Sequence, residues 1–162
     1  MKKYFLIVSL LSVVGFTSCS SDDNSGNEGQ PNALIGKWVP EKASAVVFGQ
    51  EIPDYTYQYP HTAGCTKDYI QLSENNISNL HRFEGTACAE TTSEHPWSRS
   101  GNMLTLNVLG QQITGEIKTE TNNILVLESS ASEYADIIAQ IAPEIPAALL
   151  STAKIRLTLN KN

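Results

Sequence analysis

Cysteine brings the most reactive side-chain chemistry to this chain of 162 residues, which contains three cysteines. A thiolate can attack an electrophile, ligate a metal ion or form a disulfide. Cys65 and Cys88 are far apart in the sequence, whereas zinc sites usually contain closely spaced pairs such as Cys-x-x-Cys. A disulfide between them would close a long loop and stabilise the fold by about 3.5 kcal/mol. We therefore predict a Cys65–Cys88 disulfide, an oxidising compartment and no metal site.

Other groups that could support catalysis are sparse. The sequence has no Gly-x-Ser-x-Gly elbow, no His-Glu-x-x-His motif and no phosphate-binding glycine loop. His61, His81 and His95 fall in separate segments, which favours loop or surface roles over one shared site. We expect a protein that is not an enzyme and needs no cofactor. An enzyme whose catalytic residues assemble from distant positions is the alternative.

Three tyrosines form the most unusual local pattern. Tyr55, Tyr57 and Tyr59 alternate within residues 54–60, so in an extended segment their rings share one face. Tyrosine combines a large apolar ring with a polar hydroxyl, which suits sugars, apolar ligands and protein partners. These residues are therefore candidates for ligand binding. The alternative is that the rings only cover the side of the protein's own sheet.

Charge and length limit the classes of function. The formal net charge is −6, and no cluster of lysine and arginine follows the first few residues. The chain therefore lacks the basic surface of a nucleic-acid-binding protein, and we expect no nucleic-acid partner. Its length is sufficient for one domain with one hydrophobic core. The oligomeric state is left open.

The beginning of the chain predicts export. Lys2 and Lys3 precede an apolar run from 4 to 16, the arrangement of a signal peptide. This run is shorter than the roughly twenty apolar residues that span a membrane. Residues 16–19 resemble the lipobox of bacterial lipoproteins, with Phe16 where leucine is commonest. We expect residues 1–18 to be removed and Cys19 to be lipidated; an ordinary signal peptide with a free thiol is the alternative.

The next residues predict a flexible linker and the location of the protein in the cell. Residues 20–30 contain no apolar side chain, so we assign 19–32 to a lipidated cysteine and a flexible linker, and 33–162 to a domain. The lipid would attach the protein to the outer membrane. Ser21, Asp22 and Asp23 look like acidic signals that send some lipoproteins to the cell surface. The alternative location is the periplasmic face.

Several segments alternate apolar and polar residues over the length of a strand. They are 68–72, 77–83, 103–109, 111–118, 124–127 and 153–159. Turn residues separate them, including 74–76, Gly110 with Gln111, and Asn122 with Asn123. Short strands at close spacing indicate a mainly β fold, an antiparallel meander that closes into a barrel and so removes its edges.

One segment has helical spacing. Tyr134, Ile137, Ile138 and Ile141 recur at helical intervals, with Ser132 as the expected N-cap and a proline at 143 after the run. We expect a helical insertion before the last strand, with a second turn at 147–150. This insertion could close one end of the barrel over apolar surface, or it could be a mobile lid over a ligand cavity.

Three sequence motifs resemble the lipocalin-like domains of bacterial lipoproteins. Residues 34–38 contain a Gly-x-Trp pattern at Gly36 and Trp38, and Cys65 precedes a strand. Cys88 is followed by a Trp-Ser-x-x-Gly-Asn-x-Leu pattern that contains Trp97 and Gly101. The resemblance covers about residues 33–161 and implies a barrel of about eight strands.

The resemblance also implies roles for particular residues. The glycine at 36 would permit a tight approach of the backbone, and Trp38 would close one end of the barrel. A basic residue of the last strand, Lys154 or Arg156, would lie over this ring in a cation–π contact worth about 0.5–2 kcal/mol. The helical segment is longer than the hairpin of the resembled domains.

Two functions from different classes follow. The first is a membrane-anchored binding module whose barrel holds a small, partly apolar molecule. The second is a filled barrel that binds other proteins of the envelope or cell surface and has no small-molecule ligand. The size of the interior residues decides between them, because small residues beneath a helical cover leave a cavity.

Overall fold

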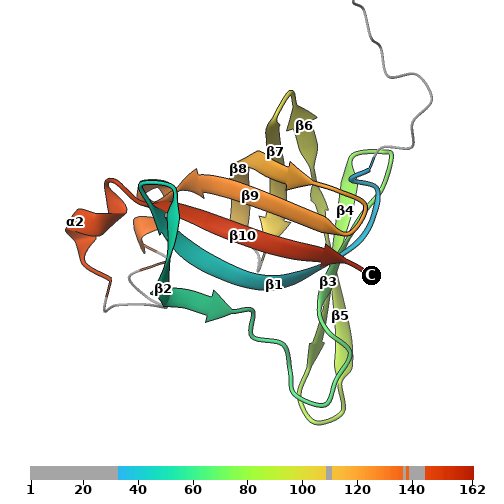
Figure 1. Cartoon of the computed structure of the whole chain (residues 1–162). Coiled ribbons are helices and arrows are strands. Elements are labelled where there is room, and N and C mark those ends of the chain that lie inside the picture. The colour runs from blue at the N-terminus through green and yellow to red at the C-terminus, as the bar shows by residue number, and fades with distance from the viewer. Residues whose placement is uncertain (1–32, 109–110, 137, 139–144) are drawn as a thin grey trace, which may run out of the picture. The chain divides into compact units, whose positions relative to one another are not determined.

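The computed structural model describes residues 33–108, 111–136, 138 and 145–162 (Figure 1). The expected signal peptide, Cys19 and the flexible linker lie outside these residues, as does part of the expected helix. Residues 31–162 cluster into one compact unit. No helix among the described residues is long and apolar enough to span a bilayer.

The described residues form ten strands where about eight were expected. The strands are β1 (Gly36–Val47), β2 (Gln50–Gln58), β3 (Tyr69–Leu72), β4 (Ile77–Glu84), β5 (Ala89–Pro96), β6 (Ser98–Ser100), β7 (Met103–Val108), β8 (Gln111–Glu120), β9 (Ile124–Ser130) and β10 (Lys154–Lys161). Strands β2 and β3 pair with different parts of β1, and β5 and β6 are separated only by Trp97. These two interruptions raise the strand count without adding a turn to the meander.

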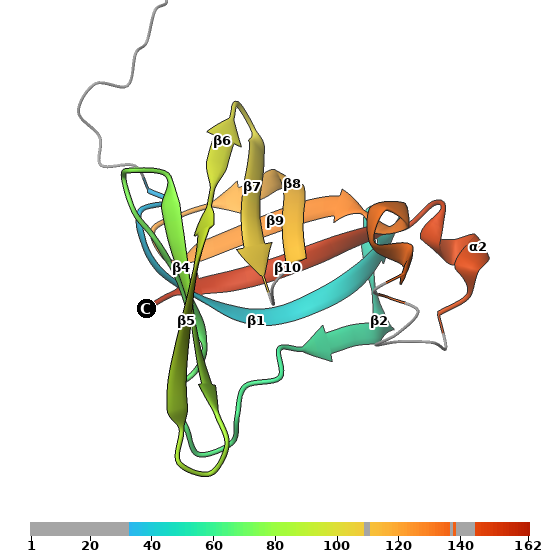
Figure 2. The same ribbon diagram turned by 180° about the vertical axis from the view of Figure 1, so that it is seen from behind.

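The sheet is an antiparallel meander in the order β5-β4-β3-β1-β10-β9-β8-β7-β6, with β2 paired to β1. Its terminal strands β5 and β6 are consecutive in the chain, so the sheet curls round into a nearly closed barrel (Figure 2). At this junction the backbone N–H of Trp97 donates to the Asn76 carbonyl at 2.9 Å, and the indole N–H donates to the Ser73 carbonyl at 3.0 Å. The predicted mainly β fold is confirmed.

Alternation along the strands fills the barrel. In β7, Leu104, Leu106 and Val108 are buried, and the residues between them are exposed or half-buried. This two-residue period is what pleated strands with one apolar face require. The main core continues this pattern in the neighbouring strands and contains Leu34, Trp38, Ile70, Leu72, Leu80, Trp97, Ile117, Leu125, Leu127, Leu157 and Leu159.

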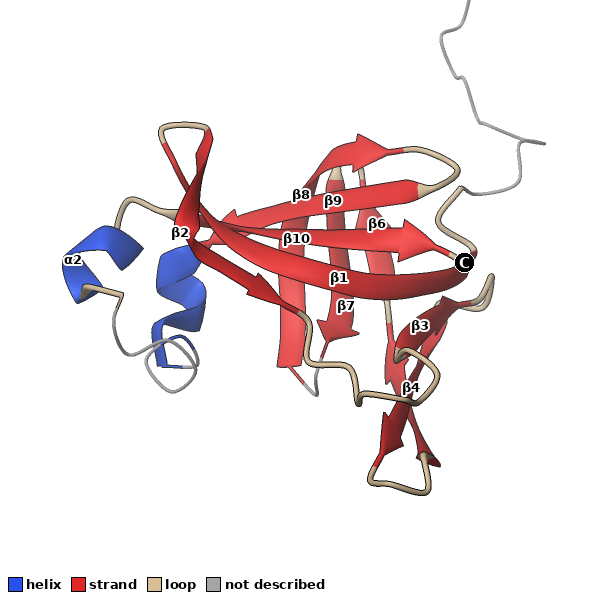
Figure 3. Cartoon of the chain, turned by 60° about the horizontal axis from the view of Figure 1, so that its bottom comes forward, coloured by secondary structure: helices blue, strands red, loops and turns tan. Residues whose placement is uncertain are grey.

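The helical elements lie together at one end of the barrel, away from the C-terminus (Figure 3). A 3-10 helix covers Ala131–Tyr134, and α2 covers Ala147–Leu150. The first helix begins two residues earlier than an N-cap at Ser132 predicts, and Ser130 occupies the N-cap position. The Ser130 and Ser132 hydroxyls bond to each other at 2.8 Å, so neither caps the helix. Residues 137 and 139–141 of the predicted helix lie outside the described residues.

Two turns depart from expectation or carry unusual backbone angles. Gln111 is the first residue of β8, whereas the sequence placed it in a hairpin turn; position 110 lies outside the described residues. Phe48 and Gly49 connect β1 to β2 with φ angles of 50° and 81°. Two successive positive φ angles match the type I′ turn of tight hairpins. Phe48 is 97% exposed at this tip.

Candidate functional site

Two hydrophobic clusters divide the interior of the barrel. The main core occupies the end at which β1 begins, where Trp38 is fully buried. A second cluster lies under the helical segment at the other end and is built on Ala131, Ile138, Leu150 and Ala153. The barrel is therefore filled at one end and covered by a separate apolar layer at the other.

A cavity of about 350 Å³ lies between the two clusters. Its walls come from β1, β2, β7 to β10 and the helical segment. The lining residues are Lys42, Ala43, Tyr57, Gln58, Tyr59, Pro60, Val108, Gln111, Ile113, Ser129, Tyr134, Ile138, Ile155 and Leu157. This volume falls in the range of small-molecule sites, which are mostly apolar with a few polar groups.

Two small residues, Ala43 and Ser129, are part of the cavity wall. Ala43 of β1 pairs with Leu157, and Ala45 pairs with Ile155 one layer further along. On the other side of β10, Ile155 pairs with Ser129. Leucine at such positions would fill the space, as it does in the main core. Small residues beneath a helical cover are the arrangement that distinguishes a binding module from a filled barrel.

Hydrogen bonds hold the rim of the cavity in place. The backbone N–H of Thr114 in β8 donates to the Tyr134 hydroxyl at 3.0 Å. The Ser129 hydroxyl donates to the Thr114 carbonyl at 2.7 Å. Gly115 is necessary beside them, because a Cβ atom there would lie 2.8 Å from the Ser129 hydroxyl oxygen. These contacts fasten the helical segment and β9 to β8.

The three predicted tyrosines are distributed over this end of the barrel. Tyr57 and Tyr59 line the cavity, and Tyr55 and Tyr57 line a smaller pocket beside it. Tyr59 also packs against the main core, and Tyr57 packs against the second cluster. Burial, followed by the negative charge of Asp68, raises the pKa of Tyr59. This phenol therefore stays neutral at physiological pH.

Charged groups near the cavity are paired. Lys42, the charged residue of the lining, lies 2.9 Å from a Glu51 carboxylate oxygen. Arg156 bridges Glu51 at 3.0 Å and donates from Nε to Glu128 at 2.9 Å. Hydrogen bonds from Lys42 and then from Arg156 hold the pKa of Glu51 below its usual value. The cavity wall therefore favours a ligand with no strong charge.

The predicted disulfide is confirmed. Cys65 and Cys88 are bonded, with their Cα atoms 5.4 Å apart, so the loop before β3 is joined to the tip of the β4–β5 hairpin. Buried Asp68 holds the same loop, because its carboxylate accepts a hydrogen bond from the Phe83 N–H at 2.9 Å. The Asp68 N–H donates to His61 Nδ1 at 3.0 Å.

The opposite end of the barrel corrects one expectation. The cation over Trp38 is Lys161, whose Nζ lies 5.1 Å from the ring centroid, not Lys154 or Arg156. The antiparallel register decides this, because Trp38 pairs with Lys161. Lys154 and Arg156 lie at the other end of β10, where both form ion pairs with Glu128.

Gly36 has a positive φ of 129°, and a Cβ atom there would lie 2.8 Å from the Lys161 side chain. The positive φ is the reason for glycine at this position, because residues with a side chain rarely adopt it. The Trp38 indole N–H donates to the Leu34 carbonyl at 2.7 Å. Gly101 has a φ of 58° in the turn between β6 and β7. These glycines serve backbone geometry, far from the cavity.

The histidines occupy three separate places. His61 Nε2 lies 2.9 Å from the Pro40 carbonyl, His81 Nδ1 lies 2.6 Å from Glu90, and His95 Nε2 lies 3.1 Å from the Ser93 hydroxyl. Within the described part of the chain, no three His, Cys, Asp or Glu residues gather as metal ligands would. The arrangement can therefore enclose an apolar molecule, and no metal chemistry is assigned to it.

Comparison with known proteins adds the family. A model of the lipocalin-like domain matches residues 34–127, more than half of the chain. The chain belongs to the lipocalin-like domain family. The match ends in β9, so the helical segment and β10 of this lipocalin-like protein lie beyond it. Neither the curated proteins nor the solved structures gave a match.

Sequence reasoning missed most of the cavity wall. The alternation placed Ile113 on one face of the strand 111–118, and Ile155 and Leu157 together on one face of the strand 153–159, but did not connect them with Ala43 or Ser129. A usable signal was present, because small residues occupy positions 43, 45, 129, 131 and 153 on strands or turns near one end of the meander. Their convergence depends on the register of β1 and β9 against β10.

Proposed function

We propose that this lipocalin-like protein is a membrane-anchored binding module that holds a small, largely apolar molecule inside its barrel. The observation that carries the proposal is the cavity of about 350 Å³ between the two hydrophobic clusters. A barrel that acted only as a solid support would gain stability from larger side chains at these positions, since empty apolar volume is costly.

The wall chemistry indicates the kind of ligand. Apolar side chains provide most of the surface, and Gln58, Gln111 and Ser129 provide a few polar groups. Lys42 is neutralised by Glu51. We infer a neutral or weakly polar molecule whose apolar body is buried and whose few polar atoms meet the amide and hydroxyl groups. We propose binding without catalysis.

We also propose that a lipid on Cys19 anchors the protein to the outer membrane, with the domain exposed on the cell surface. The support is the charged and apolar leader, the lipobox-like residues 16–19 and the polar linker with two aspartates. Anchoring would keep a binding module close to membranes, where apolar molecules are concentrated.

One experiment tests anchor and ligand together. We expect intact-mass spectrometry of the protein purified from its own host to show a polypeptide that begins at an acylated Cys19. Under native conditions, the same sample should carry a small apolar molecule that denaturation releases. Cys19→Ala should lose the acyl mass and keep the ligand. Retention of Met1 would refute the anchor, and a ligand-free native spectrum would refute the binding function.

A second candidate function is contact with another protein, and Phe48 is the observation that favours it. Phe48 exposes 97% of its surface and holds a positive φ of 50°. A bulky side chain in this left-handed region costs about 1 kcal/mol or more. A fully exposed ring recovers none of this cost inside the domain, whereas a partner protein could bury it.

Phe48→Asn separates these two effects. We expect it to raise the free energy of unfolding by about 1 kcal/mol, because Asn-Gly is the preferred pair for a type I′ turn. Urea unfolding measures this change, and Gly49→Ala, at a φ of 81°, should change stability in the opposite direction. If Phe48 contacts a partner, a photo-crosslinker at position 48 should capture one protein on cells, and one at exposed Thr119 should not. A loss of stability in Phe48→Asn would contradict the argument.

A further inference from the structure

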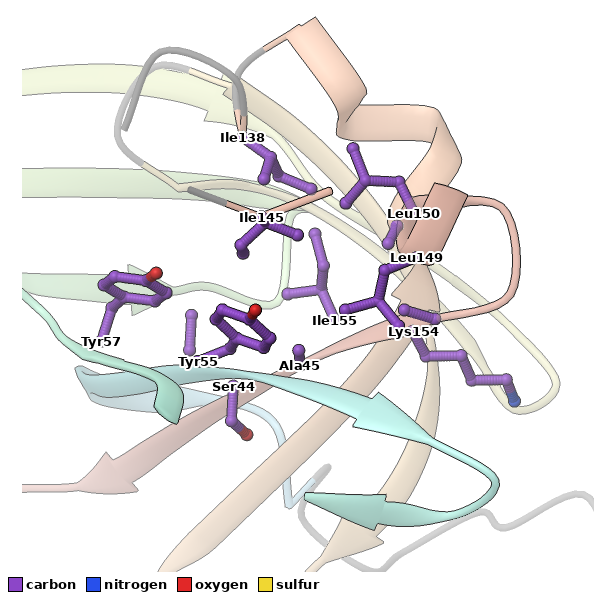
Figure 4. Close-up of a pocket in the computed structure, with 13 residues that line it drawn as sticks. Ser44, Ala45, Tyr55, Tyr57, Ile138, Ile145, Leu149, Leu150, Lys154 and Ile155 are labelled. Atoms are coloured by element: carbon purple, nitrogen blue, oxygen red, sulfur yellow. The ribbon is translucent and has the colours of Figure 1, made fainter. Parts of the chain in front are cut away.

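A second, smaller pocket of about 70 Å³ lies beside the cavity (Figure 4). It is roofed by the helical segment and floored by β1 and β2. The lining residues are Ala43, Ser44, Ala45, Tyr55, Tyr57, Ala131, Ile138, Ile145, Leu149, Leu150, Ala153, Lys154 and Ile155. In Figure 4, Tyr55 and Tyr57 face Ile138 and Ile145 across the space.

The two spaces adjoin each other. Four residues, Ala43, Tyr57, Ile138 and Ile155, line both of them. A molecule that fills the cavity would therefore contact side chains that also line the small pocket. The smaller space is too small for a ring-sized body of its own, since apolar cavities that bind benzene have about 150 Å³.

Among the lining residues, Ser44 and Lys154 direct their polar atoms away from the small pocket. Ser44 lies on the opposite side of β1 from Tyr55 and Tyr57, with its hydroxyl pointing away. Lys154 contributes its aliphatic stem, and its ammonium group lies 3.7 Å from a Glu128 oxygen. Water held in such a space lacks the two to four polar partners that would stabilise it. An apolar group entering from the cavity gains contacts and displaces little bound water.

We propose that the small pocket accepts the end of an unbranched hydrocarbon chain, so that the protein selects ligands by chain length. This inference rests on the proposed function, because the body of the same ligand would occupy the cavity. A narrow apolar space that continues a wider one suits a slender alkyl end and excludes a second ring or a charged group.

Most of the residues that line the small pocket lie beyond the part of the chain that the family model matches. The family match ends at residue 127, and eight of the lining residues lie after it: Ala131, Ile138, Ile145, Leu149, Leu150, Ala153, Lys154 and Ile155. The proposed chain-length selection therefore depends on residues of β1 and β2 inside the family match and on residues after position 127.

Displacement of a neutral fluorescent dye, N-phenylnaphthylamine, by unbranched primary alcohols tests the inference. For the wild type, we expect affinity to rise about four-fold per methylene, the change equivalent to about 0.8 kcal/mol of buried apolar surface. The rise should stop at the length that fills both spaces. A series of alcohols from about 8 to about 16 carbons should bracket that length, and the regular gain per methylene makes the point where affinity stops rising easy to locate.

Two variants should change, in opposite directions, the alcohol length at which affinity stops rising. Ala45 and Leu149 line only the small pocket. Ala45→Leu fills the small pocket, so the increase of affinity with chain length should stop at a shorter alcohol. The longest alcohol should bind this variant at least about ten-fold more weakly than the wild type, which corresponds to the loss of roughly two buried methylenes. Leu149→Ala enlarges the small pocket, so the rise should continue to a longer alcohol. Ala148→Leu, on exposed surface of the same helix, is the matched control and should change nothing.

The outcomes separate the two proposals. If alcohols bind but neither Ala45→Leu nor Leu149→Ala shifts the limiting length, the chain-length inference is wrong and the binding function stands. If the dye binds and no alcohol displaces it, the inference is also wrong. If neither dye nor alcohol binds the wild type, the proposed function fails as well. Leu149→Ala keeps the test decisive should Ala45→Leu fold poorly.

Discussion

Replacing Cys65 and Cys88 together by alanine is expected to lower the free energy of unfolding by about 3.5 kcal/mol. The two cysteines are 23 positions apart, and the loss of loop-closure entropy in the unfolded chain sets this magnitude. Domains of this size have only about 5–15 kcal/mol of stability in total. The expected loss is therefore the largest that any pair of surface substitutions in this protein should cause.

The position of the bond gives a second reason for a large effect. The disulfide joins the loop before β3 to the tip of the β4–β5 hairpin. Strand β5 contributes no buried residue, so little apolar packing holds its end of the hairpin. The hydrogen bond from Phe83 N–H to Asp68 would remain after the substitution. The domain should therefore still fold, with a less stable hairpin.

Urea unfolding of the double variant and of the wild type measures the change. Cys65→Ala and Cys88→Ala alone should each lose about as much as the pair, because one substitution already removes the cross-link. Wild-type protein treated with a reductant is a control with unchanged sequence and should match the variants. A loss below about 1 kcal/mol would show that the unfolded chain gains little freedom when the bond is absent.

Ile113→Trp is expected to weaken binding of an apolar ligand by at least about 30-fold, equivalent to about 2 kcal/mol. Ile113 lies on β8, pairs with Leu106, and lines the cavity but not the small pocket. A tryptophan ring directed into the cavity would take up part of the 350 Å³ available to a ligand and would obstruct the rest. The added ring should fill empty space, so the cost in stability should stay within about 1–3 kcal/mol.

The neighbouring position provides a matched control. Gln112 is exposed and points to the opposite face of the same strand. Gln112→Trp adds the same ring on the face of β8 that points away from the cavity, and it should leave dye affinity unchanged. Titration of both variants with N-phenylnaphthylamine, with thermal unfolding to verify folding, makes the comparison. Equal affinity of Ile113→Trp and the wild type would place the ligand outside this cavity.

Strands with one buried face were predictable from the sequence. Alternation identified β4, β7, β8 and β10 within a few residues of their observed ends. In a short segment, apolar residues at every second position indicate a strand with one buried face. The cysteine pair was equally clear. Strand β5 was missed, since its eight residues, AETTSEHP, have no buried member and hence no alternation to detect.

The pairing register between strands was not predictable from the sequence, and this register decides which residues contact each other. Lys154, Arg156 and Lys161 all lie on β10, and local pattern does not distinguish which of them faces Trp38. The pairing of β1 with β10 places Lys161 there and leaves Arg156 beside Glu128. A register shift of two residues would have placed Leu159, which has no charge, opposite Trp38.

The amino-acid sequence by itself determined the family, the disulfide and those strands that have one buried face. Only the tertiary structure decided that the barrel is hollow at one end. The physical reason is that the empty volume of a cavity depends on many side chains at once, and these side chains are distant from one another in the sequence. Ala43, Ser129 and Ile155 are unremarkable separately, and they leave space only where the curled sheet brings them together beneath Tyr134.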